Sequence, residues 1–296
     1  MQSITTFFQT LIDGVLIGGV YAVISIGLSL VFGVMHIVNF AHAEFLMLGM
    51  FIAWFAWAYA GIDPMLGAFI ALIITFFIGM GMQRVLIKPI IGAPQVAQIL
   101  LTVGLLFAME NGALLLFGAD FRSVSTSYQT QALTLFSGES GRILVPLDKL
   151  YAFLMALLSG ASLWFFLNRT SWGRAMRATS QDPMAAKLTG INTDKMYMIA
   201  FGLGVGTTAF GGAVILPYIT ASPTVGSQFV VLMFTAVVLG GLGSVAGAVV
   251  GGIMVGLIQS FSALILPIQL QNLTLFVIFI LVLALKPEGL TARRRS

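Results

Sequence analysis

Side chains capable of proton transfer or metal binding lie close together between residues 36 and 44. They are His36, Asn39, His42 and Glu44. On a regular helix Asn39 and His42 lie on one face and Glu44 lies off it, since residues two apart do not face each other. A metal or acid–base site needs further ligands, but the sequence has only 2 histidines and no cysteine. The pattern argues against an enzyme and favours residues that cap an interrupted helix or line a polar cavity.

A second pair of polar residues, Glu110 and Asn111, lies inside an apolar run. Ionisable residues within a membrane are costly and are usually turned inward or paired. This pair could line a substrate path or could bind a neighbouring helix, and the sequence leaves both alternatives open. Asp13 lies near the end of another apolar run, where we expect it to meet the membrane interface.

The largest group of charged residues lies in the segment 169–195. Within it, Asp182 is a good N-cap, because its carboxylate can accept hydrogen bonds from the unpaired amides of a first helical turn. Pro183 suits the first helical position, and Gly190 suits the left-handed end of a helix. The segment therefore predicts a short surface helix of about two turns.

This short helix has one apolar face, because Met184 and Leu188 are separated by four residues. Such a face could dock on a partner protein, or the helix could simply connect two membrane spans. If it docks, the candidate contact residues are Arg174, Arg177, Asp182, Pro183, Met184, Ala185, Lys187, Leu188 and Gly190.

The composition excludes a soluble protein. Of 296 residues, 59% are hydrophobic and 8% are charged, whereas a soluble domain has about 25% charged residues. The net charge of +4 does not indicate a nucleic-acid partner, because lysine and arginine fall between apolar runs and report membrane orientation. The predicted fold is all-α: a single transmembrane domain over residues 1–296 with about 7–9 membrane spans.

Apolar runs long enough to cross a bilayer follow one another along the chain. A final apolar region, 228–285, is long enough for up to three short crossings. The first run has no basic region before it, which predicts a retained span and not a cleaved signal peptide. The predicted spans before the final region are 11–34, 37–60, 65–83, 95–117, 149–168 and 196–216.

The positions of lysine and arginine predict the orientation of these spans. Basic residues concentrate at Arg84 and Lys88, in the segment 169–195, and in the tail that ends at Arg295. The positive-inside rule places all three in the cytoplasm. The loop 118–147 then faces outward, and the N-terminus lies on the same outer side. Such a long loop could dock a partner or serve as a linker.

Glycines are densest between residues 240 and 252. Gly243, Gly247 and Gly251 recur every four residues, which predicts a flat helix face for close packing against another helix. The segment lacks the Lys-Ser/Thr of a phosphate-binding loop. No such motif occurs elsewhere in the chain, so any ATP hydrolysis would reside in another protein.

Three segments together resemble the branched-chain amino acid ABC permease family. They are 27–33 followed by the Asn-Phe-Ala-His-Ala-Glu sequence at 39–44, the charged stretch 173–192, and the glycine-rich stretch that begins at 240. The resemblance covers nearly the whole chain and is closest to the H-type subunit. The family more often has glycine at the position of Ala43, a small departure.

The resemblance implies a permease of the bacterial inner membrane that forms half of a translocation pathway. Its implied partners are an M-type permease paralogue or a second copy, two cytoplasmic ATPase subunits and a periplasmic substrate-binding protein. The 182–190 helix would be the coupling helix, and no cofactor is implied. Related importers carry urea, short amides or small organic acids. The alternatives are a channel and a proton-coupled transporter using His42, Glu44 or Glu110 as proton carriers.

Overall fold

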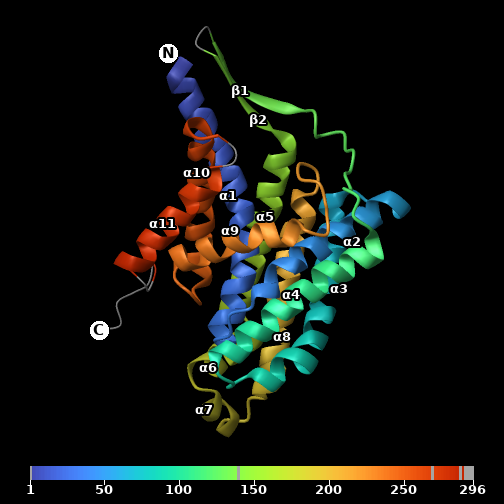
Figure 1. The fold of residues 1–296 in the computed structure, drawn as a ribbon, viewed down its shortest axis with the longest axis vertical. Coiled ribbons are helices and arrows are strands. Elements are labelled where there is room, and N and C mark those ends of the chain that lie inside the picture. Colours follow the sequence, from blue (N-terminus) through green and yellow to red (C-terminus); the bar gives the residue numbers. More distant parts are fainter. Residues whose placement is uncertain (1, 139–140, 268–269, 287–288, 290–296) are drawn as a thin grey trace.

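The computed structural model describes residues 2–138, 141–267, 270–286 and 289, and its regular structure is mostly helical (Figure 1). Within these ranges, 7 segments are long and apolar enough to cross a bilayer, and the shorter apolar helices Val225–Gly240 and Leu273–Leu285 accompany them. The predicted all-α polytopic fold is confirmed. The helices are α1 (Gln2–Met35), α2 (Glu44–Ala60), α3 (Pro64–Met82), α4 (Gln95–Phe117), α5 (Leu147–Arg169), α6 (Ser171–Gln181), α7 (Pro183–Leu188), α8 (Thr193–Ile215), α9 (Val225–Gly240), α10 (Val245–Ile265) and α11 (Gln271–Leu285).

Helix α8 forms the centre of the packed core, with α1, α2 and α3 around it. Small residues let the backbones approach closely. A Cβ atom added at Gly49 of α2 would lie 2.0 Å from the carbonyl oxygen of Ala209, and one at Gly27 of α1 would lie 2.3 Å from that of Gly204. In lipid, helix association depends on such close van der Waals packing.

Helices α1 and α10 pack against each other in opposite directions through another set of small residues. A Cβ atom at Gly252 would lie 2.3 Å from the Cα of Ala22, and one at Gly256 would lie 2.4 Å from the Cα of Gly18. Gly251 instead faces α9, where an added Cβ would lie 1.9 Å from the carbonyl oxygen of Ala236. Glycines of α10 therefore pack against two neighbouring helices.

One of the three glycines predicted to form a helix face, Gly243, lies outside the helix. Gly243 lies in the turn before α10, with φ of +82°, and α10 begins only at Val245. The side chain of Ser244 caps that helix by accepting a hydrogen bond from the amide of Gly247 (3.0 Å). A spacing of four residues does not show where a helix starts, whereas a serine N-cap does.

The outer surfaces of several helices are apolar and exposed, as expected of faces that meet lipid or another membrane subunit. Examples from α3, α4, α5 and α11 are Phe77, Leu100, Leu115, Phe165 and Ile280.

The second predicted span, 37–60, is not one continuous helix. Helix α1 ends at Met35, and His36 has a left-handed φ of +55°, a conformation that commonly follows a helix. The next residues are non-helical, a short 3₁₀ turn η1 follows (Phe40–Ala43), and α2 begins at Glu44. An interrupted helix was one of the two surroundings that the sequence left open for these residues, and the break lies just before the helical run Phe40–Ala60.

The loop 118–147 contains a β-hairpin that the sequence analysis did not predict. Strands β1 (Ala132–Gly138) and β2 (Gly141–Pro146) pair antiparallel, with an irregularity between Thr134 and Phe136. The hairpin lies at the same end of the molecule as the N-terminus, and α6 and α7 lie at the opposite end (Figure 1). This arrangement agrees with the predicted separation of an outer and an inner side.

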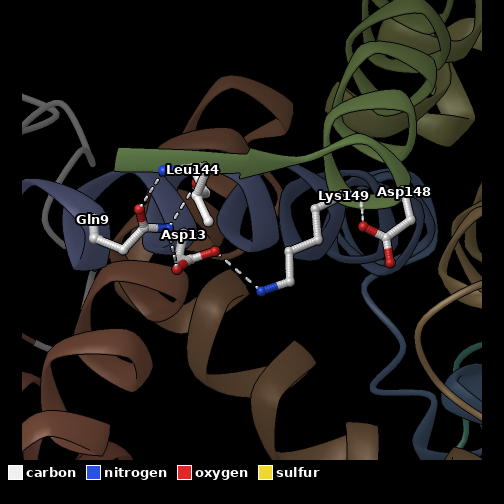
Figure 2. Close-up of polar contacts among 5 residues, drawn as sticks. All are labelled: Gln9, Asp13, Leu144, Asp148 and Lys149. Atoms are coloured by element: carbon white, nitrogen blue, oxygen red, sulfur yellow. Dashed lines mark hydrogen bonds and ion pairs between the residues drawn. The ribbon is translucent and has the colours of Figure 1, made fainter. Parts of the chain in front are cut away.

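Polar contacts tie the hairpin to α1 (Figure 2). The side-chain amide of Gln9 donates to the carbonyl oxygen of Leu144 (2.8 Å) and accepts from its amide (2.9 Å). Asp13 accepts a hydrogen bond from Gln9 and forms an ion pair with Lys149 (3.0 Å) at the start of α5. Asp13, which we expected merely to meet the interface, therefore has two polar partners there.

The rest of the outer loop is anchored to the starts and ends of spans. The indole nitrogen of Trp54 donates to the carbonyl oxygen of Ser123 (3.1 Å), and the guanidinium of Arg122 lies over the Trp54 ring. The hydroxyl of Tyr128 donates to Asp63, the N-cap of α3 (3.1 Å). Burial raises the pKa of this phenol well above its ordinary value, so it stays protonated.

Two predicted cytoplasmic segments meet at the inner end. Lys88, in the short turn η3 (Lys88–Ile90) that follows the π-helical turn η2 (Gln83–Ile87), forms an ion pair with Asp194 at the start of α8 (2.7 Å). The prediction for the three arginines of the tail falls outside the described residues.

Candidate coupling surface and buried polar cluster

Helix α7 is the short capped helix expected from the charged segment. The Asp182 carboxylate accepts hydrogen bonds from the amides of Met184 (2.8 Å) and Ala185 (2.9 Å). After the helix, Gly190 adopts a left-handed φ of +86°. The predicted N-cap and the predicted left-handed glycine are therefore confirmed.

The apolar face of α7 is presented to solvent. The side chains of Met184 and Leu188 are 70% and 84% exposed, whereas Ala186 is buried and anchors the helix to the rest of the molecule. Pro183 and Lys187 are also exposed. Large apolar side chains that are so exposed on a polar surface are typical of a protein contact.

Helix α6 leads into α7 and was missed by the sequence analysis. The Thr170 side chain caps it by accepting a hydrogen bond from the amide of Gly173 (3.1 Å), and the helix buries Met176 and Thr179. A threonine cap followed by apolar residues every three or four positions was the available signal. The charged Arg174 lies within this pattern and made the helix signal harder to recognise.

The candidate contact residues Arg174 and Arg177 have different surroundings. Arg174 is exposed on α6. The guanidinium of Arg177 donates to the carbonyl oxygen of Leu167 and to the side chain of Asn168 (3.3 Å), both at the end of α5. Arg177 therefore satisfies unpaired carbonyl groups of a helix terminus, and part of its role is to hold α6 against α5.

A buried polar cluster lies where the second span is interrupted. The side chains of Asn39, His42 and Glu44 are fully buried. The Asn39 side chain caps η1 by accepting from the amide of Ala41 (3.1 Å). The role as a helix cap, which the sequence left open for this group, is thereby confirmed for Asn39.

His42 is linked to α8 and α1 through one hydroxyl group. Its Nε2 atom lies 2.9 Å from the Thr208 hydroxyl, which also lies within hydrogen-bond distance of the carbonyl oxygens of Ile24 (3.1 Å) and Gly204 (3.2 Å). A carbonyl oxygen can only accept a hydrogen bond, so the Thr208 hydroxyl donates its proton to one of these two carbonyl groups. The Thr208 oxygen then accepts a hydrogen bond from Nε2–H of the His42 ring. Thr208 was missed by the sequence analysis, although a hydroxyl in an apolar, glycine-rich span was a signal.

The two residues of the second candidate pair, Glu110 and Asn111, have different surroundings. Glu110 lies within electrostatic range of Glu44. Asn111 is exposed on α4, and its amide donates to the carbonyl oxygen of Phe107 one turn earlier in the same helix (2.8 Å). The charge of Glu110 therefore acts on Glu44, whereas Asn111 bonds within its own helix. Among the described residues, no group of three or more His, Cys, Asp or Glu side chains could hold a metal ion.

An interrupted span with buried polar groups, apolar outer helices and a capped, exposed helix at one end indicate a multi-pass membrane protein. The family model described as "Branched-chain amino acid transport system / permease component" matches residues 10–285. The chain belongs to this family of ABC transporter permeases.

The two branched-chain amino acid relatives match nearly from end to end, whereas a sugar permease matches over part of the chain. The high-affinity branched-chain amino acid transport system permease protein BraD of Pseudomonas aeruginosa is 30% identical, with 99% of this chain and 98% of the relative covered. The corresponding LivH protein of Salmonella typhimurium is 29% identical, with 97% and 96% covered. The fructose import permease protein FrcC of Rhizobium meliloti is 36% identical over only 36% of this chain and 31% of its own length. No solved structure is significantly similar to the chain.

Proposed function

We propose that this chain is the permease subunit of an ATP-driven importer of branched-chain or other small amino acids in a bacterial inner membrane. It forms half of the translocation pathway, with an M-type paralogue or a second copy as the other half. ATP is hydrolysed by two cytoplasmic ATPase subunits, and a periplasmic binding protein delivers the substrate. The chain itself is not an enzyme.

The observation that carries this proposal is the exposed face of α7. An ATP-driven permease without a nucleotide-binding motif needs a surface through which a separate ATPase acts on it. Helix α7 offers Met184 and Leu188 at the end of the molecule where the positive-inside rule places the cytoplasm. Its short length suits a helix that is stabilised by docking, because isolated helices of this size are marginal in water.

The substrate class rests on the relatives. The matches that extend over the full chain are to proteins named for branched-chain amino acid transport, whereas the match to the fructose permease covers about a third. Amino acids are therefore favoured over sugars, and over the urea, amide and organic-acid cargoes considered from the sequence. Asn39, His42, Glu44 and Glu110 are proposed to lie along the pathway, because they are the polar groups where the second span is interrupted.

The test is purification of the tagged chain from native membranes, followed by reconstitution with its co-purifying subunits and the binding protein. We expect ATPase chains in the purified complex, and uptake of labelled L-leucine that requires both ATP and the binding protein. The permease chains recovered would distinguish a heterodimer from a homodimer. Uptake driven by a proton gradient without ATP would instead show a secondary transporter, and passive uptake would show a channel.

A further inference from the structure

The carboxylate of Glu44 is buried without a visible partner. The side chain is 0% exposed, and within the described part of the chain neither carboxylate oxygen has a hydrogen-bond partner. A carboxylate removed from water is unfavourable unless a cation, a proton or a hydrogen-bond donor compensates it. The group is thus suited to bind a cation that enters the protein during transport.

The Glu44 carboxylate is directed at the first turn of α9. A Cβ atom added at Gly226 would lie 2.5 Å from Oε2 and 2.6 Å from Oε1 of Glu44, so a side chain at this position would displace the buried carboxylate. Helix α9 has 16 residues, and its N-cap Thr224 makes no side-chain capping bond. The start of a helix carries partial positive charge and unpaired amides, which together favour a carboxylate. The Glu44 carboxylate lies beside this turn without a hydrogen bond to its amides.

The surroundings of Glu44 favour a single cationic group over a metal ion. The carboxylate of Glu110 adds a second negative charge within electrostatic range, and neither carboxylate forms an ion pair with another described side chain. His42 is engaged with Thr208 through Nε2. A calcium or magnesium ion would need about six oxygen ligands, and no cluster of three candidate metal ligands occurs among the residues described.

We propose that Glu44 and the start of α9 form a membrane-embedded site for a zwitterionic amino acid. The substrate's carboxylate binds at the start of α9, beside which the Glu44 carboxylate lies here, and Glu44 binds the substrate's ammonium group. Because Gly226 has no side chain, the Glu44 carboxylate lies close to the start of α9. This inference rests on the proposed function, because it assumes that amino acids pass through this chain.

The decisive variant is Glu44→Gln, which keeps the shape of the side chain and removes its charge. In the reconstituted complex we expect the rate of labelled L-leucine uptake to fall about tenfold or more, the effect of losing one bond to a charged group. Permease yield and ATPase retention should stay at wild-type values. The matched control is Ser25→Ala, another buried group without a hydrogen-bond partner among the described residues, which should leave uptake unchanged.

A second pair of variants tests the geometry. Gly226→Ala should reduce the yield of assembled permease, because its Cβ overlaps the Glu44 carboxylate. Combining Gly226→Ala with Glu44→Ala should restore the yield without restoring uptake. A higher yield of the double variant than of Gly226→Ala alone supports the contact between Glu44 and Gly226. A Gly226→Ala protein with normal yield and uptake contradicts it.

The outcomes separate this inference from the proposed function. If the wild-type complex imports L-leucine and Glu44→Gln imports it equally well, the ammonium site is wrong and the proposed function stands. If the wild-type complex binds ATPase subunits but imports no amino acid, the substrate in the proposed function is wrong. The proposed amino acid site at Glu44 is then wrong as well.

Discussion

Helix α7 and the Glu44 cluster are both polar interruptions of an apolar chain, but they are stabilised in opposite ways. The bonds that shape α7 join residues two or three positions apart, from Asp182 to Met184 and Ala185. The bond between His42 and Thr208 joins residues 166 positions apart. The α7 surface is exposed and suited to a partner, whereas the cluster depends on the packed core. Substitutions in α7 should therefore affect coupling, whereas substitutions that disturb the packing or the long-range hydrogen bond around the cluster should affect folding.

The largest effect is expected from overpacking the core beside α8. A Cβ atom at Gly79 of α3 would lie 2.3 Å from Cγ2 of Val205 and 3.2 Å from the Cα of Gly202, whereas Gly81 has no atom within 4 Å of such a position. Gly79→Leu should lower the free energy of unfolding by about 1–3 kcal/mol or more, and with it the yield of folded protein in detergent. Gly81→Leu, on the same helix, is the matched control. Equal yields would contradict the view that the α8 region is tightly packed.

The second effect concerns α7 and should leave the fold intact. Leu188→Asp places a charge in the proposed contact with the ATPase, where an unpaired charge is unfavourable. We expect normal permease levels in the membrane, with uptake reduced about tenfold or more and loss of bound ATPase. Tyr59→Asp changes an equally exposed apolar side chain (82%) on α2, far from α7, and should retain the ATPase. Wild-type uptake and ATPase binding in Leu188→Asp would show that α7 is only a connector.

A smaller effect is expected for the hydrogen bond between His42 and α8. Thr208→Val keeps the side-chain shape but leaves the buried His42 ring without this partner, which should lower the free energy of unfolding by about 1–3 kcal/mol. Among the residues that the structure describes, the hydroxyl of the neighbouring Thr207 bonds to the carbonyl oxygen of Gly204 in its own helix and to no other helix. Thr207→Val should therefore cost less, and thermal unfolding in detergent would compare the two. A larger loss in Thr207→Val would contradict the long-range role of Thr208.

The smallest effect is expected from the cap of α7. Asp182→Ala removes both capping hydrogen bonds, which costs about 0.5–2 kcal/mol of helix stability. Because docking supplies part of the order of α7, uptake should fall only a few-fold. Asp182→Asn retains a side-chain acceptor and should behave like the wild type in the same uptake assay. If the alanine variant impaired uptake as strongly as Leu188→Asp, the charge of Asp182 would be part of the ATPase contact.

What could be predicted from the sequence depended on how local the determining interactions were. The apolar runs predicted the spans closely, since the fourth, 95–117, coincides with α4. Asp182 and Gly190 predicted α7 because caps act within one turn. The hairpin of the outer loop was missed because its two short strands stabilise each other only after pairing.

In the candidate site, too, local features could be predicted from the sequence and long-range contacts could not. The sequence alone determined that Asn39, His42 and Glu44 lie near the start of a membrane span, because polar side chains are conspicuous in an apolar run. Only the tertiary structure decided that His42 meets Thr208 and that Glu44 meets Gly226. These partners come from helices far along the chain, and a glycine carries no side chain that could indicate its partner in advance. Composition and local caps thus determined a polytopic membrane protein with a surface helix, and the resemblance of three motifs indicated a permease, while the packing of small residues decided which polar groups meet in its interior.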